Sequence, residues 1–159
     1  MNKAYLLIGG NMGDRLANLE MAKLAIHQEI GPILLSSSLY ETAAWGKEDQ
    51  PAFLNQALLI ETNLIAHDLM MALLAIEKNM GRIRQEHLGP RTIDLDIIFF
   101  NDQIIDSANL TIPHPQMQKR NFVLTPLKEI APNFIHPILK KSITQLLTDC
   151  EDPLLCIKK

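Results

Sequence analysis

The chain has 159 residues, of which 47% are hydrophobic and 21% are charged, a composition typical of one globular domain with its own core. Its formal net charge of -3 excludes nucleic-acid binding driven by bulk positive charge. No apolar run approaches the roughly 20 residues that a membrane span needs. The two cysteines, Cys150 and Cys156, are too few for a disulfide framework. We therefore expect a reduced, cytoplasmic, monomeric protein without a nucleic-acid or membrane partner.

Hydrophobic periodicity predicts four strands and two helices in the first hundred residues. In chain order they are a strand at Ala4–Ile8, a helix from about Gly13 to Ile30, strands at Ile33–Glu41 and Phe53–Thr62, a helix from about His67 to Met80, and a strand at Asp94–Phe100. Asp14 lies in the first helical turn, where the helix dipole favours a negative charge.

The order strand, helix, strand, strand, helix, strand indicates an α+β fold with a ferredoxin-like βαββαβ core. It predicts a four-stranded antiparallel sheet with helices packed on one face, plus extra C-terminal elements. Several prolines divide the residues after Phe100 into short pieces. A last helix is expected to start at Ser142, because Ser142 and Gln145 have the spacing of a capping box.

Two aspartates open the fourth predicted strand. Strict alternation places Asp94, Asp96 and Ile98 on one face, and Leu95, Ile97 and Phe99 on the other. Two carboxylates about 6.5 Å apart repel each other unless a cation or basic groups lie beside them. Oxygen ligands of this kind suit Mg²⁺, and two such ions could clamp a triphosphate. The alternative is a pair of solvated side chains on an exposed strand, but a strand this apolar is expected to be central in the sheet, where acids need a partner.

Three arginines lie close to these acids. Arg82 and Arg84 leave the second helix, and Arg91 precedes Asp94 by three residues. Carboxylates that hold cations, beside guanidinium groups that neutralise phosphate charge, fit the binding of a metal-bound polyphosphate. An ordinary surface loop with salt bridges is the alternative. His114, between two prolines, and Arg120 are further candidates for the same site.

The motifs around these residues resemble those of the 6-hydroxymethyl-7,8-dihydropterin pyrophosphokinases of folate biosynthesis. The most specific is the run His87-Leu88-Gly89-Pro90-Arg91-Thr92-Ile93-Asp94-Leu95-Asp96. Further matching segments, in the family's order, are residues 8–14, 50–55, 81–84 and 112–114. The resemblance extends from about Ala4 to Pro137, and the family's fold is also ferredoxin-like.

The resemblance implies that residues 1–159 form a single catalytic domain. ATP, the co-substrate, would donate its β,γ-diphosphate to the hydroxymethyl group of the pterin and leave AMP. The implied ligands of two Mg²⁺ ions are Asp94 and Asp96, and the implied catalytic residues are Arg82 and Arg91. The implied ATP-binding residues are Glu77, Arg84, Ile97 (through its backbone), Thr111, His114 and Arg120. The implied pterin-binding residues are Thr42, Ala43, Trp45, Phe53, Asn55 and Phe122.

These residue types suit a pterin. A flat bicyclic ring stacks between aromatic faces such as Phe53 and Phe122, and the Asn55 amide offers both a donor and an acceptor to the ring edge. Core packing is the alternative for both phenylalanines. The chain departs from the family's pattern at Leu74, His87, Leu88, Asn109 and Pro115, most of them positions that the resemblance places near ATP.

Other functions fit the sequence less well. A ferredoxin-like domain that senses a small molecule would not need paired acids beside three arginines. A glycosyltransferase with a D-x-D motif usually has a longer chain, and a nucleotidyltransferase has its glycine-rich turn shortly before the acids, whereas Gly9 and Gly10 are far upstream. RNA binding is disfavoured because the chain is acidic and lacks paired exposed aromatics beside basic residues.

Overall fold

The computed structural model describes residues 1–43, 51–81 and 92–159. Its strands are β1 (Asn2–Gly10), β2 (Ile33–Ser36), β3 (Tyr40–Thr42), β4 (Phe53–Thr62), β5 (Asp94–Phe100), β6 (Ile105–Asp106), β7 (Thr111–Ile112) and β8 (Cys156–Lys158). Its helices are α1 (Arg15–Glu29), α2 (Ala66–Asn79), α3 (Asn121–Ile130) and α4 (Ile143–Asp149), with a short 3-10 turn at Met117–Lys119.

The main sheet confirms the predicted α+β, ferredoxin-like class, but it has six strands rather than four. The strands follow the order β5-β1-β4-β3-β8, β2 also pairs with β4, and every pairing is antiparallel. The second predicted strand is divided into β2 and β3. It breaks at Ser37, whose hydroxyl accepts a hydrogen bond from the backbone N–H of Ala57 at 2.9 Å, in place of a strand carbonyl. The sixth strand, β8, comes from the end of the chain.

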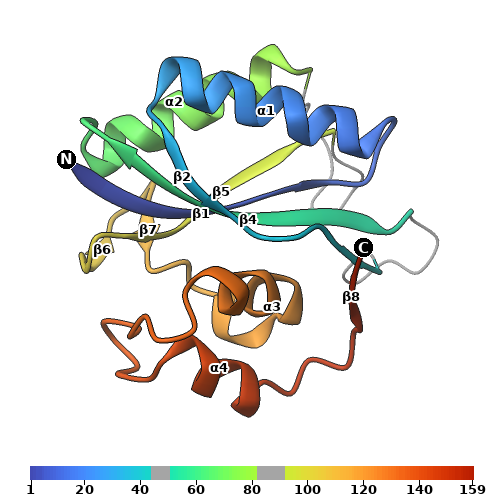
Figure 1. Ribbon diagram of the computed structural model, residues 1–159. Coiled ribbons are helices and arrows are strands. Elements are labelled where there is room, and N and C mark those ends of the chain that lie inside the picture. The colour runs from blue at the N-terminus through green and yellow to red at the C-terminus, as the bar shows by residue number, and fades with distance from the viewer. Residues whose placement is uncertain (44–50, 82–91) are drawn as a thin grey trace.

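Helices cover both faces of the sheet, not one. Figure 1 shows α1 and α2 on one side and α3 and α4 on the other. Each side has its own apolar cluster: Leu6, Ile8 and Leu58 pack under α1 and α2, while Leu7 and Ala57 pack under α3 and α4. The residues after Phe100 therefore build a second layer, which the proline-rich sequence concealed because α3 itself contains Pro126.

Strand β5, which carries the two aspartates, lies at the edge of the sheet and not at its centre. It is apolar because both of its faces are covered: Ile97 belongs to the cluster under α1 and α2, and Phe99 to the cluster under α3 and α4. The strict alternation expected for Phe99 is wrong because the pairing with β1 shifts between Tyr5 and Leu6, so that Ile98 is an extra residue. Its carbonyl instead accepts the backbone N–H of His114 at 3.0 Å.

Two helices begin with a side-chain cap. The cap at Ser142 is the one that the sequence predicted, whereas Asp14, expected in the first turn, lies one residue before α1 as its N-cap. The Asp14 carboxylate accepts a hydrogen bond from the N–H of Ala17 at 3.0 Å, and the Ser142 hydroxyl accepts one from the N–H of Gln145 at 3.1 Å. In the described part of the chain, no helix is long and apolar enough to cross a membrane.

Candidate functional site

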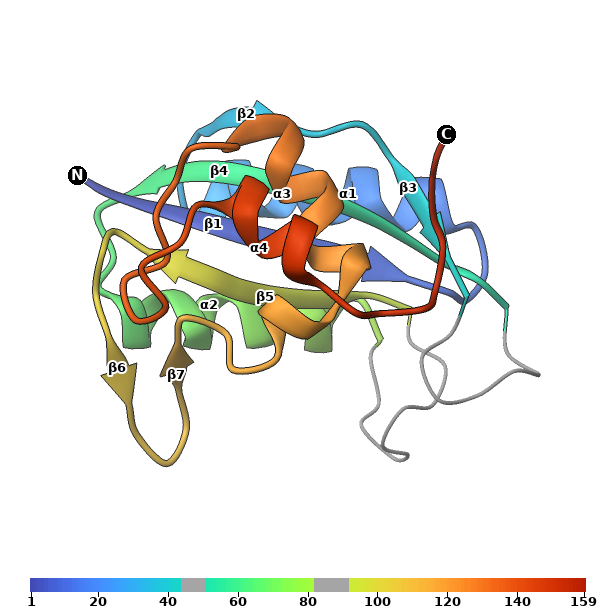
Figure 2. The ribbon, with the colours of Figure 1, turned by 90° about the horizontal axis from the view of Figure 1, so that it is seen from below.

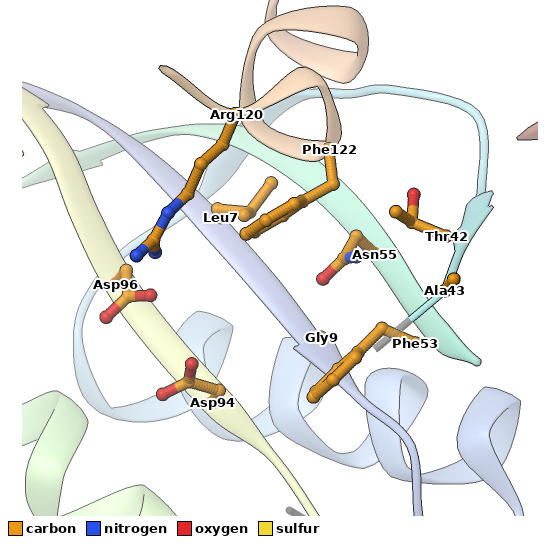
Figure 3. A pocket seen from close by; sticks show the side chains of 10 residues that line it. All are labelled: Leu7, Gly9, Thr42, Ala43, Phe53, Asn55, Asp94, Asp96, Arg120 and Phe122. Carbon is orange, nitrogen blue, oxygen red and sulfur yellow. The ribbon is translucent and has the colours of Figure 1, made fainter. Parts of the chain in front are cut away.

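A cavity lies between the sheet and the start of α3, close to the edge strand β5 (Figure 3). Ten residues line it: Leu7, Gly9, Thr42, Ala43, Phe53, Asn55, Asp94, Asp96, Arg120 and Phe122. They include both candidate metal ligands, five of the six candidate pterin-binding residues and one candidate ATP-binding residue. The structure therefore brings together residues that are separated by up to 115 positions along the chain.

The floor of the cavity is a row of paired residues across three strands. Gly9 of β1 pairs with Asp94 of β5 on one side and with Asn55 of β4 on the other. A Cβ atom on Gly9 would overlap the side-chain oxygen of Asn55. Because Gly9 has no side chain, the Asn55 amide can lie in the floor of the cavity. Gly9 belongs to the motif at residues 8–14, but neither it nor Leu7 was predicted to line this cavity.

The opposite side of the cavity comes from the first turn of α3. Figure 3 shows Arg120 extending toward Asp96, while the ring of Phe122 enters the cavity from the same helix end. The Arg120 guanidinium lies 5.7 Å from the centroid of the Phe122 ring, which is within the range of a cation–π contact. The ring of Phe53 reaches the cavity from β4, on the sheet side. Two aromatic rings from different layers thus line one cavity.

Asn55 carries an unused polar group into this cavity. The residue is only 4% exposed, and its side-chain nitrogen has no hydrogen-bond partner among the described residues. A buried donor without a partner is costly unless a ligand satisfies it. The geometry therefore suits a ligand with a hydrogen-bond acceptor at its edge.

The chain that leads into Phe53 is held from two sides. The Arg15 guanidinium donates to the Ala52 carbonyl at 2.9 Å and forms an ion pair with Glu41 at 2.7 Å. The Asn11 side chain donates to the Pro51 carbonyl at 3.1 Å. These contacts have no local signal along the chain, because they join α1 and the residue after β1 to a segment about forty residues away.

A second cavity lies on the other side of the β5 edge. It is lined by Met70, Leu73, Leu74, Leu95, Asp96, Ile97, Ala108, Asn109, Leu110, Thr111, His114 and Pro115. Three candidate ATP-binding residues, Ile97, Thr111 and His114, are therefore together. Asp96 lines both cavities, so that a ligand in each would meet at this carboxylate.

His114 is a neutral side chain at physiological pH. Burial, and then the positive charge of Arg120, lower its pKa from 6.5 to about 4, against an opposing effect of Asp94. Its Nδ1 atom accepts a hydrogen bond from the N–H of Gln116 at 3.3 Å. The proton of the neutral ring is therefore on Nε2, which makes this nitrogen a donor.

The lowered histidine pKa values predict a loss of stability at acidic pH. The unfolded chain takes up a proton at His114 near pH 6.5, whereas the folded chain does so only near pH 4. Below pH 6.5 the unfolded state therefore binds more protons, and the free energy of unfolding falls. For His114 we expect a loss of roughly 2 kcal/mol between pH 7 and pH 5. Burial also lowers the pKa of His136, which adds an effect of the same sign.

Urea unfolding at pH 7, 6 and 5 measures this dependence. His114→Gln should remove its share of the slope, and a wild-type slope in this variant would contradict the prediction. His67→Gln, which makes the same substitution at an exposed histidine, is the matched control and should unfold like the wild type at pH 7.

Glu77 does not line either cavity among the described residues. Its carboxylate is 2% exposed and accepts a hydrogen bond from the backbone N–H of Leu95 at 2.7 Å. Leu95 lies between the two aspartates on β5, and Glu77 lies on α2. This hydrogen bond therefore attaches the acidic part of β5 to α2.

Four candidate residues lie outside the described residues: Trp45, Arg82, Arg84 and Arg91. Within the described residues, no group of three or more histidine, cysteine or acidic side chains could hold a metal ion. Asp94 and Asp96 alone fit a cation that completes its shell with water and phosphate oxygens, which is the preference of Mg²⁺.

The sequence model of one family, 7,8-dihydro-6-hydroxymethylpterin-pyrophosphokinase (HPPK), matches residues 5–132. The chain belongs to this family. The expected family and the expected class of enzyme, a diphosphokinase, are thereby confirmed.

Several HPPK relatives carry the name 2-amino-4-hydroxy-6-hydroxymethyldihydropteridine pyrophosphokinase. The protein from Synechocystis is 46% identical over 92% of this chain and 76% of its own length. The protein from Aquifex aeolicus is 40% identical over 100% of this chain and 99% of its own length. The folic acid synthesis protein FOL1 of Dictyostelium discoideum is 42% identical over 87% of this chain, which spans 21% of that protein.

Crystal structures of HPPK-DHPS from Plasmodium falciparum share the fold. The wild-type structure superimposes with a TM-score of 0.76 at 19% identity and covers 94% of this chain, which spans 43% of the Plasmodium chain. A triple mutant superimposes with a TM-score of 0.78 at 20% identity. At this level of identity the likeness supports the fold alone.

Proposed function

We propose that the chain transfers the β,γ-diphosphate of ATP to the hydroxymethyl group of 6-hydroxymethyl-7,8-dihydropterin, giving AMP, in folate biosynthesis. The observation that carries this proposal is the position of Asp96, which lines both cavities. A transfer between two substrates needs their reacting atoms to meet, and the two cavities meet beside an acidic pair.

The first cavity is the proposed pterin site. The ring would lie between Phe53 and Phe122 and direct its polar edge at Asn55, whose unpaired nitrogen supplies a donor. The proposed set of pterin-binding residues is Thr42, Ala43, Trp45, Phe53, Asn55 and Phe122. This arrangement leaves the hydroxymethyl group on the side of the cavity that Asp94 and Asp96 line.

The second cavity is the proposed nucleotide site. Leu73 and Leu110 offer an apolar surface to the adenine, and the backbone of Ile97 lies in the same wall. His114, neutral and protonated on Nε2, would act as a hydrogen-bond donor rather than as a cation. The proposed set of ATP-binding residues is Glu77, Arg84, Ile97, Thr111, His114 and Arg120, in which Glu77 acts by holding β5 in place.

Asp94 and Asp96 are the proposed ligands of two Mg²⁺ ions. When bound, Mg²⁺ neutralises phosphate charge and orients the triphosphate. The two carboxylates face the same side of β5 and line the first cavity together, which supports a site for the ions on the side of the cavity proposed for the acceptor hydroxyl.

The transfer forms one bond to the β-phosphorus and breaks one. The hydroxymethyl oxygen bonds to the β-phosphorus, the bond from that phosphorus to the oxygen bridging it to the α-phosphorus breaks, and the hydroxyl proton is released. Arg82 and Arg91 are the proposed catalytic residues, because fixed guanidinium groups stabilise charge on the transferred and leaving groups. Arg120 brings a further positive charge to the side of Asp96 (Figure 3).

Release of AMP tests the proposal. Purified protein is mixed with ATP, Mg²⁺ and 6-hydroxymethyl-7,8-dihydropterin, and AMP and the diphosphorylated pterin are separated chromatographically. We expect the two products in equal amounts, and no AMP when the pterin is omitted. Binding of both substrates without AMP would instead support a sensor.

Three properties complete the proposal. Residues 1–159 act as a single catalytic domain, as a monomer, and in the cytoplasm. Sedimentation at enzyme concentrations from micromolar upward measures the molecular mass in solution. A monomer should give a mass near 17.9 kDa.

A further inference from the structure

The end of the chain returns from α4 to the cavity that contains Phe122. Figure 2 shows the segment after α4 running past the start of α3 toward β3. The strand β8 pairs with β3, and Cys156 is opposite Thr42, a lining residue of the cavity. The N–H of Lys159 also donates to the carbonyl of Leu39 at 2.9 Å. These residues lie beyond position 132, where the match to the family ends.

The helix α3 begins without a cap of its own. Its N-cap residue is Arg120, which makes no side-chain capping bond. The side chain that would occupy the cap position instead extends into the cavity (Figure 3). An arginine at this position cannot accept a hydrogen bond, so the first backbone N–H groups of the helix need an acceptor from elsewhere.

Asp152 supplies this acceptor from the end of the chain. Its Oδ2 atom accepts the backbone N–H of Asn121 at 2.9 Å, and its Oδ1 atom accepts the N–H of Leu154 at 2.9 Å. The Asn121 side chain donates in return to the carbonyls of Asp152 at 3.0 Å and Leu154 at 3.2 Å. A carboxylate at a helix N-terminus also interacts favourably with the helix dipole.

Asn121 lies between the two residues that α3 contributes to the cavity. Arg120 precedes it and Phe122 follows it. Fraying of the first helical turn would therefore move both side chains. Since β8 is paired with β3, the same segment connects this turn to the wall that carries Thr42 and Ala43.

We infer that Asp152 is a positioning residue of the pterin site: it caps α3 from the end of the chain and so holds Phe122 and Arg120 against the wall built by β3. This inference rests on the proposed function and extends it to a segment outside the matched family region.

Pterin affinity tests the inference. Titration calorimetry measures the Kd of 6-hydroxymethyl-7,8-dihydropterin in the presence of Mg²⁺ and a non-hydrolysable ATP analogue. Asp152→Ala should raise this Kd roughly ten-fold. The Kd of the analogue alone should rise less, because Phe122 lines the pterin cavity only and Arg120 is the one proposed ATP-binding residue that Asp152 positions. Asp152→Asn, which keeps one acceptor oxygen for Asn121, should restore most of the affinity. Glu151→Ala, one residue earlier and exposed, is the matched control and should bind the pterin like the wild type.

The outcomes separate the inference from the proposed function. A wild-type pterin Kd in folded Asp152→Ala would overturn the positioning role and leave the proposed function intact. Equal or stronger weakening of the analogue would also overturn it, because Phe122 and Arg120 both line the pterin cavity and neither lines the nucleotide cavity. If wild-type protein does not bind the pterin at all, the proposed function fails and the inference fails with it. Should Asp152→Ala not fold, Asp152→Glu serves the same comparison, because it moves the carboxylate by one methylene group and should weaken pterin binding selectively.

Discussion

Replacement of Asp96 by asparagine is expected to lower kcat at least roughly 1,000-fold, as loss of a metal ligand beside transferring phosphate does. The substitution keeps the size of the side chain and removes its charge. Asp96 lines both cavities, and no other acidic residue in the described part of the chain does so. The change relieves repulsion from Asp94 and weakens the attraction of Arg120, which extends toward Asp96 (Figure 3). These effects on folding oppose each other, so the melting temperature should stay within a few degrees.

The matched control for Asp96 is Asp106→Asn, which makes the same change on the exposed end of β6. Steady-state AMP release and thermal unfolding are measured for both variants. A kcat within ten-fold of wild type in Asp96→Asn would remove Asp96 from the metal site. A collapse of its melting temperature would instead assign the residue a structural role.

Replacement of Asn55 by leucine is expected to separate activity from stability. Loss of the amide should raise the KM for the pterin roughly 100-fold, since the hydrogen bonding that the amide is proposed to offer the ring edge disappears. The same change removes a buried nitrogen that has no partner in the described structure. The free energy of unfolding should therefore rise by roughly 1 kcal/mol.

Urea unfolding and pterin-dependent kinetics check this pair of effects. Asn63→Leu, an exposed position in the turn after β4, is the control and should change neither quantity appreciably. If the free energy of unfolding falls together with the pterin affinity, the Asn55 amide stabilises the sheet. The polar edge of the pterin would then need a hydrogen-bond partner other than Asn55.

Much of the first half of the fold could be read from local patterns. The bounds Phe53–Thr62 and Asp94–Phe100 are the same in the sequence analysis and in the structure, because long apolar segments with strand propensity are recognised from neighbouring residues alone. The capping signal at Ser142 is equally local. Local motifs also sufficed to identify the family, and with it the pairing of Asp94 with Asp96.

The segments after Phe100 were less predictable. The helix α3 contains a proline and follows a proline-rich stretch, so its local signal is weak. It forms because Val123, Leu124 and Leu127 pack against an apolar face of the sheet. Without that helix, Arg120 and Phe122 had no predicted position relative to the sheet.

The sequence by itself indicated a candidate site for a metal-bound polyphosphate, with two acids on one strand and arginines close to them in the chain, and its resemblance to the family implied the pterin-binding residues. The tertiary structure decided how these groups meet. The register across β5, β1 and β4 placed Gly9 between Asp94 and Asn55, and the return of the chain end placed Asp152 at the start of α3. Periodicity reports only the neighbours along the chain, whereas strand register and helix docking depend on contacts between segments far apart in sequence. For that reason the acidic pair was visible in the sequence, and the cavity around it only in the fold.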